Sequence, residues 1–118
     1  FARAAGDGRG FVASPEYDAA VLALAEGLRD ELRLGQSEAT DLLAIGLSAT
    51  DYVGHTYGTQ GAEMCVQLLA LDEMLGAFFA DLDRVGIDYV VVVTGDLITA
   101  DLINQIPFVL KERFQFYG

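Results

Sequence analysis

Residues 41–63 read DLLAIGLSATDYVGHTYGTQGAE, and the rest of the chain is organised around this stretch. The apolar run Leu42–Leu47 predicts a buried strand, because it is short and apolar on both faces. Residues 48–61 are polar and rich in glycine, which predicts a loop. This loop holds the only histidine, His55, four residues after Asp51. A carboxylate and an imidazole that follow a strand are candidate metal ligands or acid–base groups.

A second strand is expected at Asp88–Thr94, where four consecutive valines favour burial on both faces. Residues 62–84 predict a long helix, because their apolar side chains recur at intervals of three and four. Strand, helix and strand with short joints predict a right-handed parallel βαβ unit. Asp96 follows the second strand, so the sheet would bring Asp51, His55 and Asp96 to one edge. The expected apolar face of the long helix comprises Met64, Leu68, Leu71, Leu75, Phe78, Phe79 and Leu82.

Residues 15–34 predict an amphipathic helix that Ser14 caps, Pro15 begins and Gly35 ends. Another helix is expected after Thr99, divided by Pro107. The predicted fold class is therefore α/β, in the order helix–strand–helix–strand–helix. The apolar stripe expected on residues 15–34 consists of Val21, Leu24, Leu28 and Leu32, with Ala25 beside it and the charged side chains facing solvent.

The 118 residues are expected to form a single domain or a fragment of one. Its parts would be a loop at 1–13, a core at 14–96 and an apolar tail at 97–118. The chain begins with Phe1 rather than Met, and we expect it to be a piece of a longer protein. The lone Cys65 lies in an apolar helical stretch, which favours a small buried side chain over a reactive thiol.

The charge balance bears on possible partners. Seven basic and eighteen acidic residues give a net charge of 7 − 18 = −11. Such a chain would repel the phosphates of nucleic acids and of anionic membranes, so neither is expected as a partner. A phosphate-ester substrate is disfavoured for the same reason, unless a bound divalent cation reverses the local field. No apolar run is long enough to span a bilayer.

The element Thr50–His55, TDYVGH, with its flanking residues resembles the alkaline phosphatase superfamily. The resemblance is to bacterial alkaline phosphatases related to type I phosphodiesterases and nucleotide pyrophosphatases. It covers roughly residues 11–96. Further matches are Ser14-Pro15, Leu34-Gly35-Gln36, Thr40-Asp41-Leu42-Leu43, Thr56-Tyr57-Gly58, Glu63, Leu71-Asp72 and Val93-Thr94.

The resemblance implies a two-zinc enzyme that hydrolyses phosphate esters, and part of a three-layer sandwich fold. By that resemblance Asp51 and His55 bind one zinc ion and Asp96 binds the second. The family motif continues from that Asp into His-Gly, but Leu97 and Ile98 stand there in this chain. The family's Ser/Thr nucleophile and further ligands have no counterpart, so no catalytic residue is assigned and the chain alone is expected to be inactive.

Two interpretations therefore stay open. The chain is either a segment of a zinc-dependent phosphatase or phosphodiesterase, or a non-catalytic truncated or engineered α/β domain that retains vestigial metal ligands. The apolar tail is expected to pack on missing parent segments or to promote self-association. The resemblance suggests an exported parent, although no residue determines the compartment, the oligomeric state or the choice between mono- and diesters.

Overall fold

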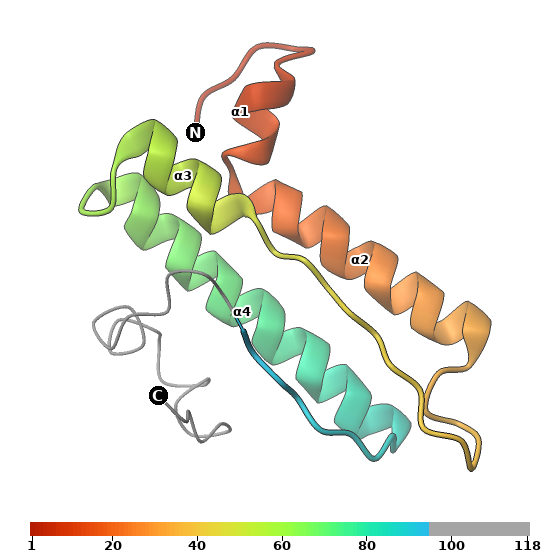
Figure 1. Ribbon diagram of the computed structural model, residues 1–118. Helices are drawn as coiled ribbons and strands as arrows, with labels where there is room; N and C mark the ends of the chain where they lie inside the picture. The colour runs from red at the N-terminus through yellow and green to blue at the C-terminus, as the bar shows by residue number, and fades with distance from the viewer. Residues whose placement is uncertain (95–118) are drawn as a thin grey trace.

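The computed structural model describes residues 1–94, and these residues form four helices. They are α1 (Gly8–Val12), α2 (Pro15–Leu32), α3 (Ala49–Tyr57) and α4 (Ala62–Val85) (Figure 1). Helices α2 and α4 pack along each other, and α3 crosses one end of both. The expected helix after Thr99 lies outside the described residues.

Helix α4 follows the prediction closely. It begins after Gly61 and ends at Gly86, whose φ of 81° suits a glycine at the end of a helix. Four of the predicted apolar side chains are buried, namely Met64, Phe78, Phe79 and Leu82. The remaining leucines of that face are half-buried. Gln67 is not among the predicted apolar residues of this helix, yet its side chain is fully buried.

Helix α2 begins at Pro15 as predicted but buries a different face. The buried residues are Asp18, Leu22, Ala25 and Arg29. Leu24 and Leu32, both assigned to the core from their spacing, are more than half exposed. Helix α2 is apolar on two sides, and the packing partner α4 decides which side is covered. Ser14 stands at the N-cap position as predicted, but its hydroxyl donates to the carbonyl of Phe11 and makes no capping hydrogen bond to the helix.

The core lies between α2 and α4. Leu22 and Ala25 of α2 meet Phe78, Phe79 and Leu82 of α4. Burying a large apolar side chain contributes roughly 1.5–3 kcal/mol, so these few residues dominate the stability of the helix pair. Tyr89 stacks on Phe79 with ring centroids 6.3 Å apart and joins the chain after α4 to the same core.

The prediction of an α/β fold with a parallel βαβ unit is wrong for the described residues. No strand forms within residues 1–94, and the regular structure there is helical. Residues 41–47 and 87–94 are extended, but no backbone hydrogen bond joins one to the other. A strand is defined by hydrogen bonds to a neighbouring strand, so an extended segment without that ladder is not one.

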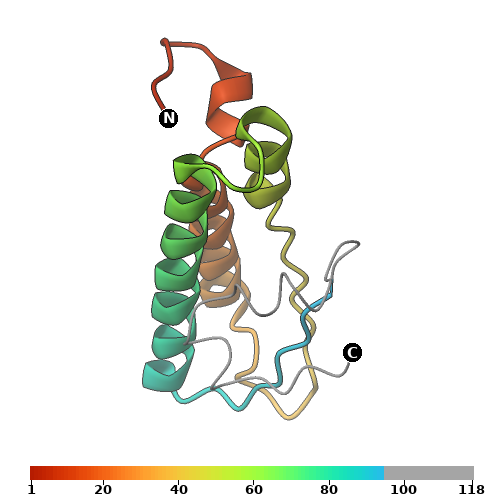
Figure 2. The same cartoon turned by 90° about the vertical axis from the view of Figure 1, so that its left-hand side faces the viewer.

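The two extended segments nevertheless pack on the helices with a period of two. Leu43, Ile45 and Leu47 turn toward the core. Ile87, Tyr89 and Val91 do the same in the second segment. Figure 2 shows both segments on the same side of the α2–α4 pair. Both run from the end of the pair where α2 and α4 terminate toward the end that α3 crosses. Apolar contact with the helices therefore holds these segments extended without a sheet.

The N-terminal residues contain more structure than the predicted loop. Asp7 caps α1 by accepting a hydrogen bond from the Gly10 amide at 2.9 Å. The ring of Phe1 packs edge-on against Tyr57, with centroids 5.5 Å apart. This contact places the start of the chain beside the end of α3.

Among residues 1–94, no helix combines the length and apolar character that a bilayer crossing needs.

Candidate metal site

Helix α3 carries the two candidate ligands that the sequence places in a loop. The loop prediction for residues 48–61 is wrong, because Ala49–Tyr57 is helical. Ala49 and Val53 lie one turn apart and are fully buried, which anchors one face of the helix. Gly58 ends the helix with a φ of 85°. The glycines of this stretch suggest a loop, but the burial of Ala49 and Val53 overrides them.

Asp51 and His55 lie one turn apart on α3. The Nε2 atom of His55 is 3.4 Å from Oδ1 of Asp51. Both side chains are largely exposed, at 60% for Asp51 and 79% for His55. Asp51 is in the first turn of the helix, where its carboxylate complements the helix dipole, and His55 is in the last turn. The structure therefore brings these two predicted ligands together and presents them to solvent.

Asp96, the third predicted ligand, lies outside the described residues. Within residues 1–94, no group of three or more His, Cys, Asp or Glu side chains is arranged to hold a metal ion. The described part of the chain offers a pair of donors, and a closed tetrahedral zinc site needs four. The sheet edge expected to unite Asp51, His55 and Asp96 is absent from the described part of the chain.

Two buried polar residues lie behind this pair and were missed by the sequence reasoning. The Asp18 carboxylate of α2 accepts a hydrogen bond from the Ala49 amide at 3.1 Å. Gln67 of α4 donates to Asp18 at 3.4 Å and to the Thr50 hydroxyl at 3.3 Å. Burial raises the pKa of Asp18, while the hydrogen bonds from Ala49, Ser48 and Gln67 oppose that rise. The sequence does contain a signal for the burial of Asp18. Asp18 precedes Leu22 by four residues and Ala25 by seven, so all three side chains lie on the same face of α2.

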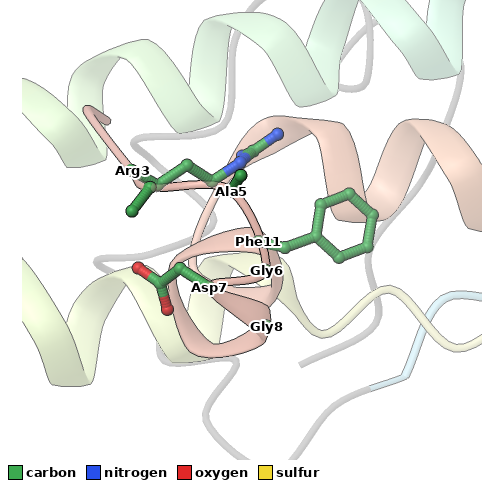
Figure 3. Close-up of a pocket in the computed structure, with 7 residues that line it drawn as sticks. Arg3, Ala5, Gly6, Asp7, Gly8 and Phe11 are labelled. Atoms are coloured by element: carbon green, nitrogen blue, oxygen red, sulfur yellow. The ribbon is translucent and has the colours of Figure 1, made fainter.

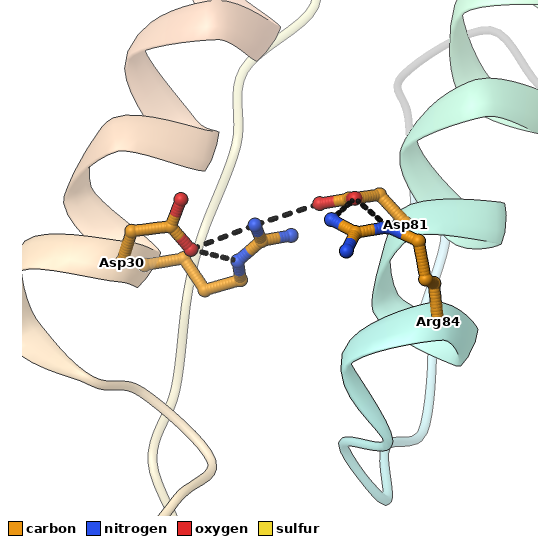
Figure 4. A network of polar contacts seen from close by, with 4 residues as sticks. Asp30, Asp81 and Arg84 are labelled. Carbon is orange, nitrogen blue, oxygen red and sulfur yellow. Dashed lines mark hydrogen bonds and ion pairs between the residues drawn. The ribbon is translucent and has the colours of Figure 1, made fainter.

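A second polar network ties the other ends of α2 and α4 together. Arg29 is only 4% exposed, and its Nη2 lies 2.7 Å from both the Asp30 and the Asp81 carboxylates. Arg84 also bonds to Asp81 (Figure 4). The bonds from Arg84 and then Arg29 lower the pKa of Asp81. This network is structural, because it holds two helices together through a buried guanidinium.

An open pocket lies at the N-terminal segment, between residues 3 and 11 (Figure 3). Its charged side chains are already engaged. Arg3 donates to the Ser14 hydroxyl at 2.9 Å and lies over the Phe11 ring, 5.3 Å from its centroid. Asp7 caps α1. Neither Asp51 nor His55 lines this pocket, so it is separate from the candidate metal ligands.

Cys65 differs from its prediction. It is a free, exposed cysteine, so the expectation of a small buried side chain is wrong. Met64 and Gln67 are buried, whereas Cys65, the residue directly after Met64, is turned outward.

Comparison with known proteins shows that the chain is similar to several alkaline phosphatases. Alkaline phosphatase PhoK of Sphingomonas sp is 58% identical over 96 residues, which is 81% of this chain and 17% of that protein. Alkaline phosphatase PhoD of Zymomonas mobilis subsp. mobilis is 51% identical over 94 residues, 80% of this chain and 16% of that protein. Alkaline phosphatase PafA of Elizabethkingia meningoseptica is 35% identical over 71 residues, 60% of this chain and 13% of that protein.

The family pattern of type I phosphodiesterase / nucleotide pyrophosphatase matches residues 9–110. The chain belongs to this family, which confirms the resemblance seen at Thr50–His55. The match extends past Asp96 into residues 97–110, which belong to the expected apolar tail. The chain spans about one sixth of the length of its PhoK and PhoD relatives.

Proposed function

We propose that this chain supplies part of the zinc site of a phosphate-ester hydrolase, with Asp51 and His55 as two ligands of one ion. The observation that carries the proposal is the 3.4 Å approach of His55 Nε2 to Asp51 Oδ1 on the exposed face of α3. Their sequence context supports it, because TDYVGH lies within the stretch that matches the family.

The donors fit half of a zinc site. Imidazole nitrogen and carboxylate oxygen are common zinc ligands, bound at about 2.0–2.2 Å. Two ligands one helical turn apart can approach the same ion, since residues four apart lie on one helix face. No third ligand joins them within residues 1–94, so the remaining donors of this ion would come from elsewhere. Asp96 is proposed as a ligand of the second ion on sequence alone.

The chain's own role is to hold and orient the metal. When bound, zinc would polarise a phosphoryl oxygen and lower the pKa of an attacking hydroxyl. The ion would also offset the repulsion between an anionic phosphate ester and a chain whose net charge is −11. Asp51 and His55 would fix its position on the rigid helix α3, which buried Ala49 and Val53 anchor.

We further propose that these 118 residues are a segment of a larger enzyme and have no activity alone. The chain spans 17% of its PhoK relative, and no Ser/Thr nucleophile of the family pattern is recognised in it. The covalent route that needs such a nucleophile would then depend on other parts of the parent protein.

The competing proposal is a non-catalytic domain with vestigial ligands. It is favoured by Leu97 and Ile98, which replace the His-Gly of the family's second metal motif. The gene sequence around Asp96 separates the two proposals. An open reading frame that restores His-Gly supports the enzyme, and one that retains Leu97-Ile98 supports the non-catalytic domain.

The metal proposal can be tested with the chain as it is. Zinc is titrated into the wild-type chain, the His55→Ala variant and the Asp51→Asn variant, and binding is followed by calorimetry. We expect weak binding to the wild type, because it offers few ligands, and loss of that binding in both variants. Glu73→Gln on α4, an exposed acidic position, serves as a control that should bind zinc as the wild type does. Tight binding that His55→Ala leaves unchanged would refute the assignment.

A further inference from the structure

A buried polar cluster joins the three longer helices directly behind the Asp51–His55 pair. Its members are Asp18 of α2, Gln67 of α4 and the first turn of α3. The side chains of Asp18 and Gln67 are both 0% exposed. The two oxygens of Asp18 accept from the Ala49 amide at 3.1 Å and from the Gln67 amide at 3.4 Å. Gln67 also reaches Thr50, so the first turn of α3 is held at two points.

Asp18, which belongs to α2, caps the N-terminus of α3 by accepting a hydrogen bond from the Ala49 amide. The N-cap residue of α3 is Ser48, and its side chain makes no capping hydrogen bond. The first amides of a helix need acceptors, and a carboxylate near them also complements the positive end of the dipole. These donors explain why a carboxylate is found fully buried, where an unpaired one would be strongly disfavoured.

The position of α3 depends on such contacts. The helix has nine residues, and an isolated helix of that length is not stable in water. Asp51 lies two residues after Ala49, the residue whose amide Asp18 accepts. A shift of the first turn of α3 would therefore move Asp51, which lies in that turn. It would also move His55, which lies one turn further along the helix.

We propose that Asp18, held in place by Gln67, is a positioning residue for the Asp51–His55 pair. It sets where α3 begins relative to α2 and α4, and thereby where the two donors are presented. The metal-binding consequence rests on the function proposed above. The effect on the orientation of His55 rests on the hydrogen bonds alone.

The test uses the single histidine of the chain as a reporter. The imidazole signals of His55 are recorded by NMR in the wild type, Asp18→Ala, Asp18→Asn and the control Glu31→Ala, which removes an exposed charge from the same helix. Zinc affinity is then measured by titration on the same samples, well below each melting temperature. We expect Asp18→Ala to shift the His55 signals and to weaken zinc binding about tenfold or more. Substitution of residues that orient metal ligands commonly lowers metal affinity by that amount.

Asp18→Asn is expected to restore the wild-type behaviour. Its amide oxygen still accepts from the Ala49 amide. Its new N–H₂ group can donate to Gln67 Oε1, which has no hydrogen-bond partner within residues 1–94. Glu31→Ala should leave both the signals and the affinity unchanged. If Asp18→Ala does not fold, Gln67→Met carries the same test, because it removes the amide that holds Asp18 and Thr50.

The outcomes separate this proposal from the one it rests on. Zinc binding that depends on His55 but is unchanged in Asp18→Ala, with unshifted imidazole signals, overturns the positioning role and leaves the metal site standing. Zinc binding that is unchanged in His55→Ala refutes the metal site. Shifted His55 signals in Asp18→Ala would still support the positioning role in that case. Failure of Asp18→Asn to restore the signals would overturn the capping explanation.

Discussion

The backbone at Gly35 shows how a single residue decides a local path. Its φ is +74°, a conformation that side chains with a Cβ adopt at a cost of roughly 1–2 kcal/mol. A Cβ placed there would also lie 2.7 Å from Cγ2 of Ile87, which is attached to a stiff β-branched carbon. Gly35 thus lets the turn after α2 approach the extended segment that follows α4.

Gly35→Ala is expected to destabilise the chain by more than the backbone penalty alone. Gly27→Ala is the matched control, because Gly27 lies inside α2 with open space around it. That substitution should stabilise by about 0.5–1 kcal/mol through helix propensity. Urea unfolding of the two variants should therefore move in opposite directions. Equal midpoints would show that residue 35 does not hold this conformation in solution.

At the scale of elements, the Arg29 network holds the far end of the α2–α4 pair. The guanidinium is buried, while Asp81 reaches it from the other helix at 2.7 Å. The Asp18–Gln67 cluster does the equivalent at the α3 end. The helix pair is therefore joined by apolar contacts in the middle and by polar bonds toward each end.

Asp81→Asn is expected to lower the melting temperature at neutral pH, because it removes one charged partner of buried Arg29. The hydrogen bonds from Arg84 and Arg29 lower the pKa of Asp81 in the folded chain. A carboxyl with a lowered folded pKa contributes stability above its unfolded pKa of about 4, and loses it as the pH falls through the folded value. The difference in melting temperature between the wild type and Asp81→Asn should therefore be largest at neutral pH and become smaller in acid.

Thermal unfolding followed by circular dichroism at neutral pH and at acid pH below the ordinary carboxyl pKa checks this expectation. Glu73→Gln, which changes an exposed carboxyl on the same helix, should show no such pH-dependent difference. A deficit in Asp81→Asn that persists undiminished in acid would mean that the ion pair is not its source.

On the scale of the whole molecule, the extended segments leave an apolar surface uncovered. Leu42, Val90 and Val92 point away from the helices and are 89%, 90% and 83% exposed. Exposed apolar side chains promote association in water where they gather into a patch. The sequence-based expectation of self-association rested on the tail, which lies outside the described residues. The described residues provide a separate physical reason for it.

Sedimentation velocity across a concentration series tests this reason. Wild-type chain is expected to associate with further copies of itself as its concentration rises. A triple variant, Leu42→Ser with Val90→Ser and Val92→Ser, should remain monomeric over the same range. Its melting temperature should change little, because the three side chains make few contacts with the core. Equal association of the two chains would assign the effect to another surface.

Local pattern by itself determined several features of this protein. Proline at the first helical position predicts the start of α2 at Pro15, and periodicity with a closing glycine predicts the extent of α4 up to Gly86. The β-branched valines predict the extended character of residues 88–94. The TDYVGH element also indicated the family, which the comparison confirmed. These signals act over a few residues, so they can be read without knowing what packs against them.

Other features were decided only by tertiary structure. Helix α2 has apolar side chains on two faces, and contact with α4 selected Leu22 and Ala25 over Leu24 and Leu32. Helix α3 forms in a glycine-rich stretch because Ala49 and Val53 are buried and Asp18 caps it from α2. The expected sheet is absent from residues 1–94 because a strand requires a hydrogen-bonding neighbour, which no local pattern can supply.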